Sequence, residues 1–237
     1  MVITQALPTK DAVLQLEPEE LGSYVLGHFP PNTDQVQPTN FLGEVRNHYK
    51  SDTQVERALM EAWAWLIREG LLVENAGGYG NCFISRRGQR LRERPQDFET
   101  FRRSNILPKE SLHPVIAGEV WSTFIRGKYE VAVFQALKEV EVAVRAAGGF
   151  SLTDLGTELM GKAFNFNSGP LADMTLPEAE RRSMLHLFTG AVGLFKNPSS
   201  HRHVALNDPR EAAEIIALVS LLMRIVDFRD ASRAPQP

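Results

Sequence analysis

The segment Lys196-Asn197-Pro198-Ser199-Ser200-His201 lies between two stretches whose apolar residues recur at helical spacing. Pro198 ends the first helix, because the residue before a proline disfavours the α region. The second helix is predicted to begin at Asp208-Pro209-Arg210-Glu211, where the aspartate caps it and the proline takes its first position. The segment is therefore predicted to be a loop that carries a cation and an imidazole between two long helices.

The C-terminal half contains four such helical stretches. They are predicted over Val115 to Arg126, from Tyr129 to Gly148-Gly149, from Thr175-Leu176-Pro177-Glu178 to Pro198, and from Asp208 onward. The third start has the Ser/Thr-x-x-Glu spacing of a capping box, in which a hydroxyl and a carboxylate each accept a backbone N–H bond. Four helices around one core are the simplest fold for residues 110–229.

The N-terminal half has a different order of elements. A helix is predicted from Val55 to Glu69, followed by two extended segments, Leu71-Leu72-Val73 and Cys82-Phe83-Ile84-Ser85, around the glycine-rich turn at 75–81. This order resembles the second half of a winged helix-turn-helix. The predicted fold class is therefore mainly α, with a winged helix-turn-helix-like α+β domain followed by a four-helix bundle.

Positive charge is concentrated directly after this predicted hairpin. The cations there are Arg86, Arg87, Arg90, Arg92, Arg94, Arg102 and Arg103, against the acids Glu93, Asp97 and Glu99. The first five arginines are the candidate nucleic-acid-binding residues, because local positive charge beside a wing suits contact with phosphates. A solvated helix remains the alternative, and winged-helix domains also dock proteins.

Composition limits the classes of function. The 237 residues include 26 Lys and Arg against 29 Asp and Glu, a net charge of −3, so nucleic-acid binding must come from a local patch. The single Cys82 excludes a disulfide framework and a four-cysteine zinc site. The N-terminus does not have the pattern of a secretory signal, and the apolar run from Ile215 to Met223 has about half the length needed to span a bilayer. We therefore expect a cytoplasmic protein without membrane contact.

The Lys196-to-His201 segment resembles the Arg-Asn-Pro-x-x-His form of the motif in the HEPN superfamily, with Lys196 where Arg is usual. Further landmarks place the resemblance over roughly residues 112–228 and closest to the Ymh-type branch. They are Leu112-His113-Pro114, Gly127 to Ala132, Lys138-Glu139-Val140-Glu141, Leu159 to Phe164 and Asp208 to Ala212. Many HEPN domains are metal-independent ribonucleases of toxin and antiphage systems, and others are inert binding partners.

The resemblance implies catalytic roles for His201, Lys196 and Asn197. Histidine suits proton transfer near neutral pH, and a fixed cation stabilises charge on the phosphate. The family tends to keep an acidic or polar group near the end of the second helix, facing the motif. Glu139 and Glu141 point to opposite sides of a helix, and Glu141 is favoured, with a solvated role for either as the alternative. The expected site uses no metal or cofactor, and RNA is its expected substrate. The family pattern also implies a homodimer whose two motifs share one cleft.

The predicted organisation is a tail at 1–17, a winged-helix-like domain at 18–94, a linker at 95–110, a HEPN-type helical domain at 111–229 and a tail at 230–237. The N-terminal domain would recognise DNA or a partner protein. The leading hypothesis is a metal-independent HEPN endoribonuclease of a toxin or antiphage defence system. The alternative is a non-catalytic module, either a DNA-binding regulator or a docking subunit of a defence complex.

Overall fold

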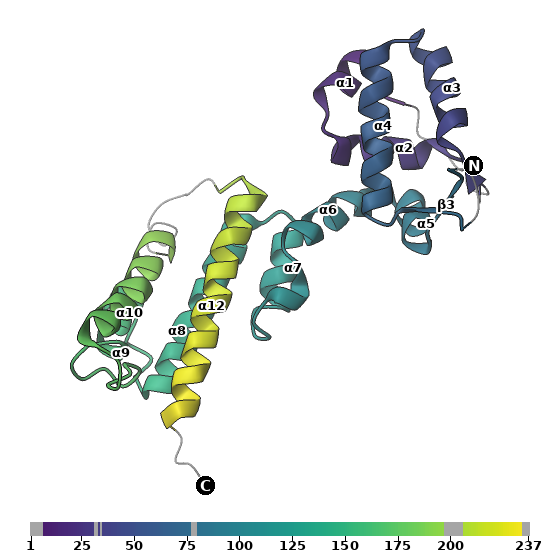
Figure 1. The fold of residues 1–237 in the computed structure, drawn as a ribbon. Coiled ribbons are helices and arrows are strands. Elements are labelled where there is room, and N and C mark those ends of the chain that lie inside the picture. Colours follow the sequence, from purple (N-terminus) through teal and green to yellow (C-terminus); the bar gives the residue numbers. More distant parts are fainter. Residues whose placement is uncertain (1–6, 31–32, 34, 77–79, 197–205, 234–237) are drawn as a thin grey trace. The chain divides into compact units, whose positions relative to one another are not determined.

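A computed structural model describes residues 7–30, 33, 35–76, 80–196 and 206–233. The chain divides into two compact units, Met1–Arg102 and Arg103–Pro237, each with its own hydrophobic core. Both units are mainly helical, as the sequence predicts, and a small sheet lies in the first (Figure 1). None of the described helices has the length and apolar character needed to cross a membrane.

The first unit joins helices to three short antiparallel strands. In chain order its elements are α1 (Lys10–Gln15), α2 (Pro18–His28), β1 (Gln35–Val36), α3 (Pro38–Tyr49), α4 (Thr53–Arg68), β2 (Leu72–Glu74), β3 (Cys82–Ile84), α5 (Arg86–Glu93), the 3₁₀ turn η1 (Pro95–Asp97) and the first half of α6 (Phe98–Ile106), a helix whose second half belongs to the other unit. The strand order is β1-β3-β2, with Val36 opposite Cys82 and Leu72 opposite Ile84. Strand β3 is therefore the central strand, and it pairs with β1 from before α4 and with β2 from directly after α4.

Helix α4 is the centre of this unit. Asp52 caps it by accepting hydrogen bonds from the Gln54 and Val55 amides, and the helix packs against α1, α2 and α3. Its apolar stripe is buried, and Trp63 stacks on Phe41 of α3 with ring centroids 5.5 Å apart. The apolar residues that recur at helical spacing in 55–69 thus form the face of α4 on which the neighbouring helices pack.

The ends of this unit differ from the prediction. Residues of the predicted tail at 1–17 form α1, whose Val13 is fully buried, and the Tyr49 hydroxyl donates to the Pro8 carbonyl. Much of the predicted linker at 95–110 is α6, whose Phe98 packs on Trp65 with ring centroids 5.8 Å apart. Short helices with one buried apolar residue each have too few turns to show a period in the sequence.

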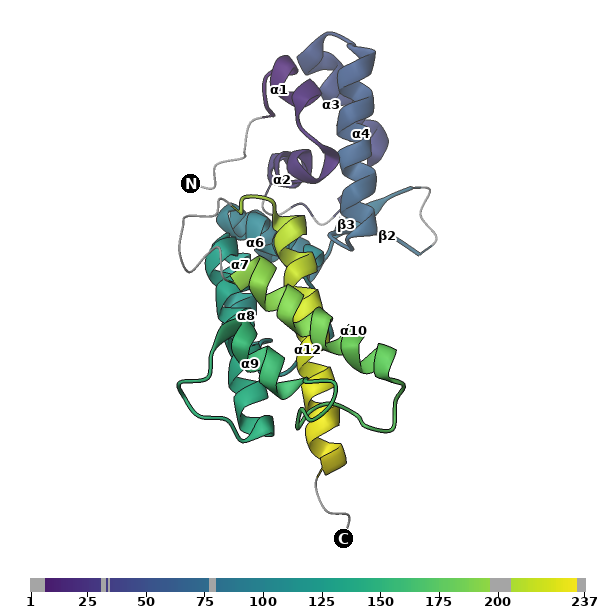
Figure 2. The same cartoon turned by 90° about the vertical axis from the view of Figure 1, so that its left-hand side faces the viewer.

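The second unit contains the predicted helical half. Its elements are η2 (Lys109–Ser111), α7 (Glu119–Ile125), α8 (Tyr129–Gly148), α9 (Gly156–Ala163), α10 (Glu178–Ala191), the π-helical segment η3 (Val192–Lys196) and α12 (Pro209–Arg233). Helices α8 and α12 lie side by side (Figures 1 and 2) and bury their apolar stripes in one core. Helix α12 also takes in residues 230–233 of the predicted C-terminal tail.

Two predicted helix starts in this unit are wrong. Helix α10 begins at Glu178 after Pro177 without a side-chain cap, because the Thr175 hydroxyl donates instead to Asp173 Oδ1 at 2.6 Å. Helix α7 begins at Glu119 rather than Val115, because residues 114–118 form turns after His113. The His113 amide donates to Ser220 Oγ at 2.8 Å, and His113 Nε2 lies 2.7 Å from Asp227 Oδ2. Both contacts hold the residue before these turns against α12.

Helix α5 approaches the β2 end of the sheet at a glycine, which gives a stability prediction. An alanine methyl at Gly88 would lie 2.4 Å from the Leu71 carbonyl oxygen and 2.9 Å from the Ile84 methyl group. We expect Gly88→Ala to lower the free energy of unfolding by about 1–3 kcal/mol. Gly43→Ala in α3 is the control, because nothing lies within 4 Å of its added methyl.

The control should be neutral or stabilising by about 0.5–1 kcal/mol, since alanine favours a helix over glycine. Urea unfolding followed by tryptophan fluorescence measures both variants. Equal stability of Gly88→Ala and the wild type would show that α5 does not pack here as described.

Candidate functional site

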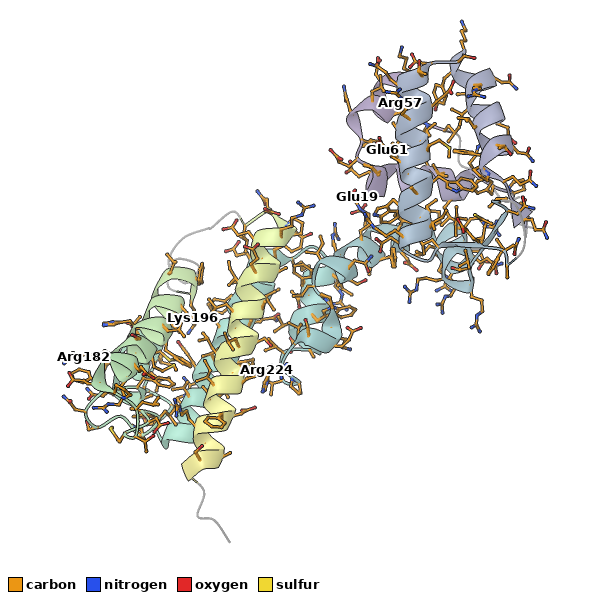
Figure 3. All side chains as sticks on the ribbon, viewed as in Figure 1. Glu19, Arg57, Glu61, Arg182, Lys196 and Arg224 are labelled. Atoms are coloured by element: carbon orange, nitrogen blue, oxygen red, sulfur yellow. The ribbon has the colours of Figure 1, made fainter. Side chains whose placement is uncertain are left out.

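Lys196 ends the π-helical segment that extends α10. At the junction the Val192 amide hydrogen-bonds to the carbonyls of Phe188 and Thr189, and the wider turn of η3 begins there. π-Helical turns inside helices occur mostly as single turns and often at functional sites. The segment brings Lys196 to the last described position before the loop that the sequence singles out (Figure 3).

The Lys196 ammonium lies against the carboxylate of Glu141 on α8. Its Nζ is 2.6 Å from Glu141 Oε1, and the two side chains are 15% and 2% exposed. Glu139, the other acidic candidate, is only partly buried. The structure thus brings together two of the predicted site residues, Lys196 and Glu141.

The same carboxylate faces two more positive groups. The Gly156 amide at the start of α9 donates to Glu141 Oε1 at 2.9 Å, and Arg145 Nη1 lies 3.7 Å from Glu141 Oε2. Gly156 has a φ of 59°, which glycine adopts without steric penalty, so its amide can face the carboxylate. A helix N-terminus carries partial positive charge. One buried carboxylate is therefore surrounded by two cations and a helix N-terminus, and the cluster has a net positive charge.

Arg145 is the member of this cluster that the sequence analysis missed. Its Nη1 also donates to the Asp154 carbonyl at 3.2 Å, and its side chain is 14% exposed. The signal in the sequence was a glutamate followed four residues later by an arginine on one helix, which is common on solvated helix surfaces. The burial of Glu141 and the bond from Arg145 to the Asp154 carbonyl distinguish it from such a pair.

Two predicted catalytic residues, Asn197 and His201, lie outside the described residues, as does His203. Of the other histidines, His113 pairs with Asp227 and His28 Nε2 lies 2.7 Å from Glu44. Burial raises the pKa of the Cys82 thiol, which disfavours the thiolate. Within the described part of the chain no three His, Cys, Asp or Glu residues are grouped as metal ligands.

The candidate nucleic-acid-binding arginines lie on or next to α5 and divide into two groups. Arg92 donates from Nη1 to the Pro30 carbonyl at 2.9 Å, so it packs toward the unit. Arg86, Arg90 and Arg94 are exposed at intervals of four residues, and no ion pair or side-chain hydrogen bond joins them to any residue that the structure describes. Arg87 is also exposed, with its guanidinium 5.8 Å from the centre of the Phe101 ring. We call Arg86, Arg87, Arg90 and Arg94 the α5 basic face.

The fold and the Glu141 cluster define the second unit as a helical domain with a buried ionic site beside the predicted motif loop. Residues 110–226 match a family model described as a protein of unknown function (Hypoth_ymh). This match supports a Ymh-type domain in the C-terminal half. No curated protein and no solved structure matches the chain.

Burial of the Glu141 carboxylate gives a prediction that separates it from Glu139. Glu141→Gln leaves the Lys196 ammonium largely buried without its anion, so we expect a loss of about 3 kcal/mol in the free energy of unfolding. Glu139→Gln should stay within about 0.5 kcal/mol of the wild type. Chemical unfolding followed by circular dichroism measures both.

A double variant tests the pairing itself. Lys196→Met combined with Glu141→Gln removes both charges and should destabilise less than the sum of the two single substitutions. Additive effects would mean that the two side chains do not interact in solution.

Proposed function

We propose that the C-terminal half is a HEPN-type, metal-independent endoribonuclease of a toxin or antiphage defence system. The observation that carries this proposal is the contact of Lys196 with Glu141, which fixes a cation five residues before His201. The core that α7, α8, α10 and α12 share supports the HEPN-type bundle. The proposal includes a cytoplasmic location, where Cys82 would stay reduced.

In the proposed reaction the substrate's own 2′-hydroxyl attacks the phosphorus. His201 takes the hydroxyl proton, the P–O2′ bond forms, and the P–O5′ bond breaks as the leaving oxygen receives a proton. Lys196 stabilises the added negative charge on the phosphorus, and Glu141 acts as a positioning residue for it. In a homodimer the second His201 would be the proton donor. Neither role requires a metal.

For the N-terminal half we propose a winged-helix domain that binds nucleic acid through the α5 basic face. The helix pair α3 and α4 and the strand order β1-β3-β2 support the winged-helix assignment. Like charges four residues apart on a helix repel each other, so a phosphate bound between them relieves the repulsion. The exposed side of α4 carries Arg57 and Glu61 (Figure 3), charges of opposite sign, and so attracts phosphate less than α5 does.

A second candidate function is a non-catalytic binding module, in which the helical half only dimerises and the first unit docks DNA or a partner protein. The specific observation in its favour is the engagement of Lys196. The Lys196 side chain is 15% exposed, and its ammonium already lies 2.6 Å from a carboxylate oxygen of Glu141, as in a structural ion pair. The two candidate functions differ in whether the protein cleaves RNA and whether that activity requires His201.

The ribonuclease proposal predicts RNA cleavage in excess chelator. The products should carry 2′,3′-cyclic phosphate ends, because the attacking group is the adjacent 2′-hydroxyl. His201→Ala should abolish cleavage without unfolding the protein, and Lys196→Arg should keep or raise the rate, since a guanidinium matches phosphate oxygens in a two-pronged contact. Gel assays with end-group analysis measure these outcomes.

If the wild type and Lys196→Arg leave varied RNAs intact, the non-catalytic module is the better description. Cleavage that survives His201→Ala would point to a contaminating nuclease or to another site.

The α5 basic face predicts salt-dependent binding of nucleic acid. Arg86→Gln with Arg90→Gln should weaken binding and reduce the slope of log affinity against log salt by about two. Arg57→Gln with Arg68→Gln on α4 is the control with the same change in charge, and it should leave the slope nearly unchanged. Fluorescence anisotropy over a salt series measures the slopes. Nucleic-acid affinity that does not change with salt concentration, or no binding of nucleic acid at all, would favour protein docking.

A further inference from the structure

One nitrogen of the Arg145 guanidinium contacts the protein, and the other two have no partner among the described residues. Its Nη1 donates to the Asp154 carbonyl at 3.2 Å and lies 3.7 Å from Glu141 Oε2. In the described part of the chain, its Nε and Nη2 have no hydrogen-bond partner. The buried side-chain atoms without a partner there are only Gln135 Oε1 and Arg229 Nε, so these two Arg145 nitrogens reach solvent.

The Nε and Nη2 groups form one edge of the guanidinium. Two parallel N–H bonds on such an edge match two oxygens of a phosphate, which a lysine ammonium cannot reproduce. Arg145 shares the Glu141 carboxylate with Lys196, one cation on each oxygen. A guanidinium with a free edge thus lies beside the cation that the motif supplies.

We infer that Arg145 and Lys196 together bind the scissile phosphodiester of RNA, with Arg145 supplying the two-pronged contact that a lysine at position 196 lacks. This inference rests on the proposed function of the same site. Glu141 carries one negative charge against the positive charges of the two cations and the α9 N-terminus. The surplus is positive, so an anion is attracted to the cluster.

The role of Arg145 in the reaction is electrostatic. Its Nε–H and Nη2–H donate to the two non-bridging phosphate oxygens, whose charge grows as the P–O2′ bond forms and before the P–O5′ bond breaks. Protons move only between the 2′-hydroxyl, His201 and the leaving 5′-oxygen. The step balances without any further reactant.

The test compares full-length wild type with Arg145→Gln, Arg145→Lys and the double variant Arg145→Gln/Lys196→Arg. We expect Arg145→Gln to lower kcat/KM for RNA about 100-fold, the effect of removing one preorganised donor from a reacting oxygen. Arg145→Lys keeps the charge without the fork and should recover only part. The double variant restores a guanidinium at the motif position and should regain most of the lost activity.

Arg182→Gln is the matched control. Arg182 pairs with Glu178 four residues earlier on α10, as Arg145 does with Glu141 on α8. The control removes an arginine from a similar helical pair in the same unit, and its activity should equal that of the wild type. Thermal unfolding of every variant shows whether a loss of activity follows a loss of folding.

A binding measurement separates this inference from the proposed function. In the His201→Ala background, Arg145→Gln should weaken binding of 2′-O-methylated RNA about tenfold, the loss of a charge-assisted hydrogen-bonding pair. If the wild type cleaves no RNA, the proposed function fails, and this affinity decides the role of Arg145. Unchanged affinity would then overturn the inference.

Two results with an active wild type would also overturn it. One is wild-type kcat/KM in Arg145→Gln. The other is a loss of activity that follows lower thermal stability and is not regained with Lys196→Arg, because Arg145 would then only tie α8 to the Asp154 loop.

Discussion

The buried carboxylate of Glu141 is the constraint on which the candidate site depends. Removing a carboxylate from water costs several kcal/mol, so the fold must bring compensating groups to it. Here they come from three places: Arg145 on α8, the first amide of α9, and Lys196 at the end of η3. The position of Lys196 therefore follows from the charge on Glu141. Asn197 and His201 follow this fixed point in the sequence.

The π-helical segment η3 links the core to this ion pair. Before it in the chain, Phe188 stacks on Phe164, the residue directly after α9, with ring centroids 3.9 Å apart, and both rings are fully buried. The wider turn changes the direction of the residues that follow, and its Gly193 lies close to Thr157 on α9. Apolar packing thus sets where α10 lies, and the widened turn presents Lys196 to Glu141.

The sequence predicted the elements with long apolar stripes. The apolar residues of α4, α8 and α12 recur at helical spacing over several turns. Asp208 caps α12, as its position in the sequence indicated. Helices α1 and α6 bury too few apolar residues to show a period. Thr175 had the spacing of a cap but bonds to Asp173, a competitor that spacing alone does not reveal. In the site, Glu141 was identified through the family resemblance, whereas the spacing of Arg145, four residues after a glutamate, is also that of an ordinary pair on a helix surface. What marks Arg145 is its bond to the Asp154 carbonyl, which depends on where the loop after α8 turns.

The two cations of the cluster differ in how they are held, and this bears on the lysine in the motif. Arg145 belongs to a long helix, and its Nη1 is fixed by the Asp154 carbonyl, so the orientation of its planar group is set before any anion arrives. Lys196 is at a helix end, and its ammonium, which pairs with Glu141, has three rotatable donors on a flexible four-carbon stem. Preorganised donors stabilise developing charge better than donors that must reorient. A site in which the rigid fork comes from α8 can therefore accept a lysine in the motif, because the lysine needs to supply only charge.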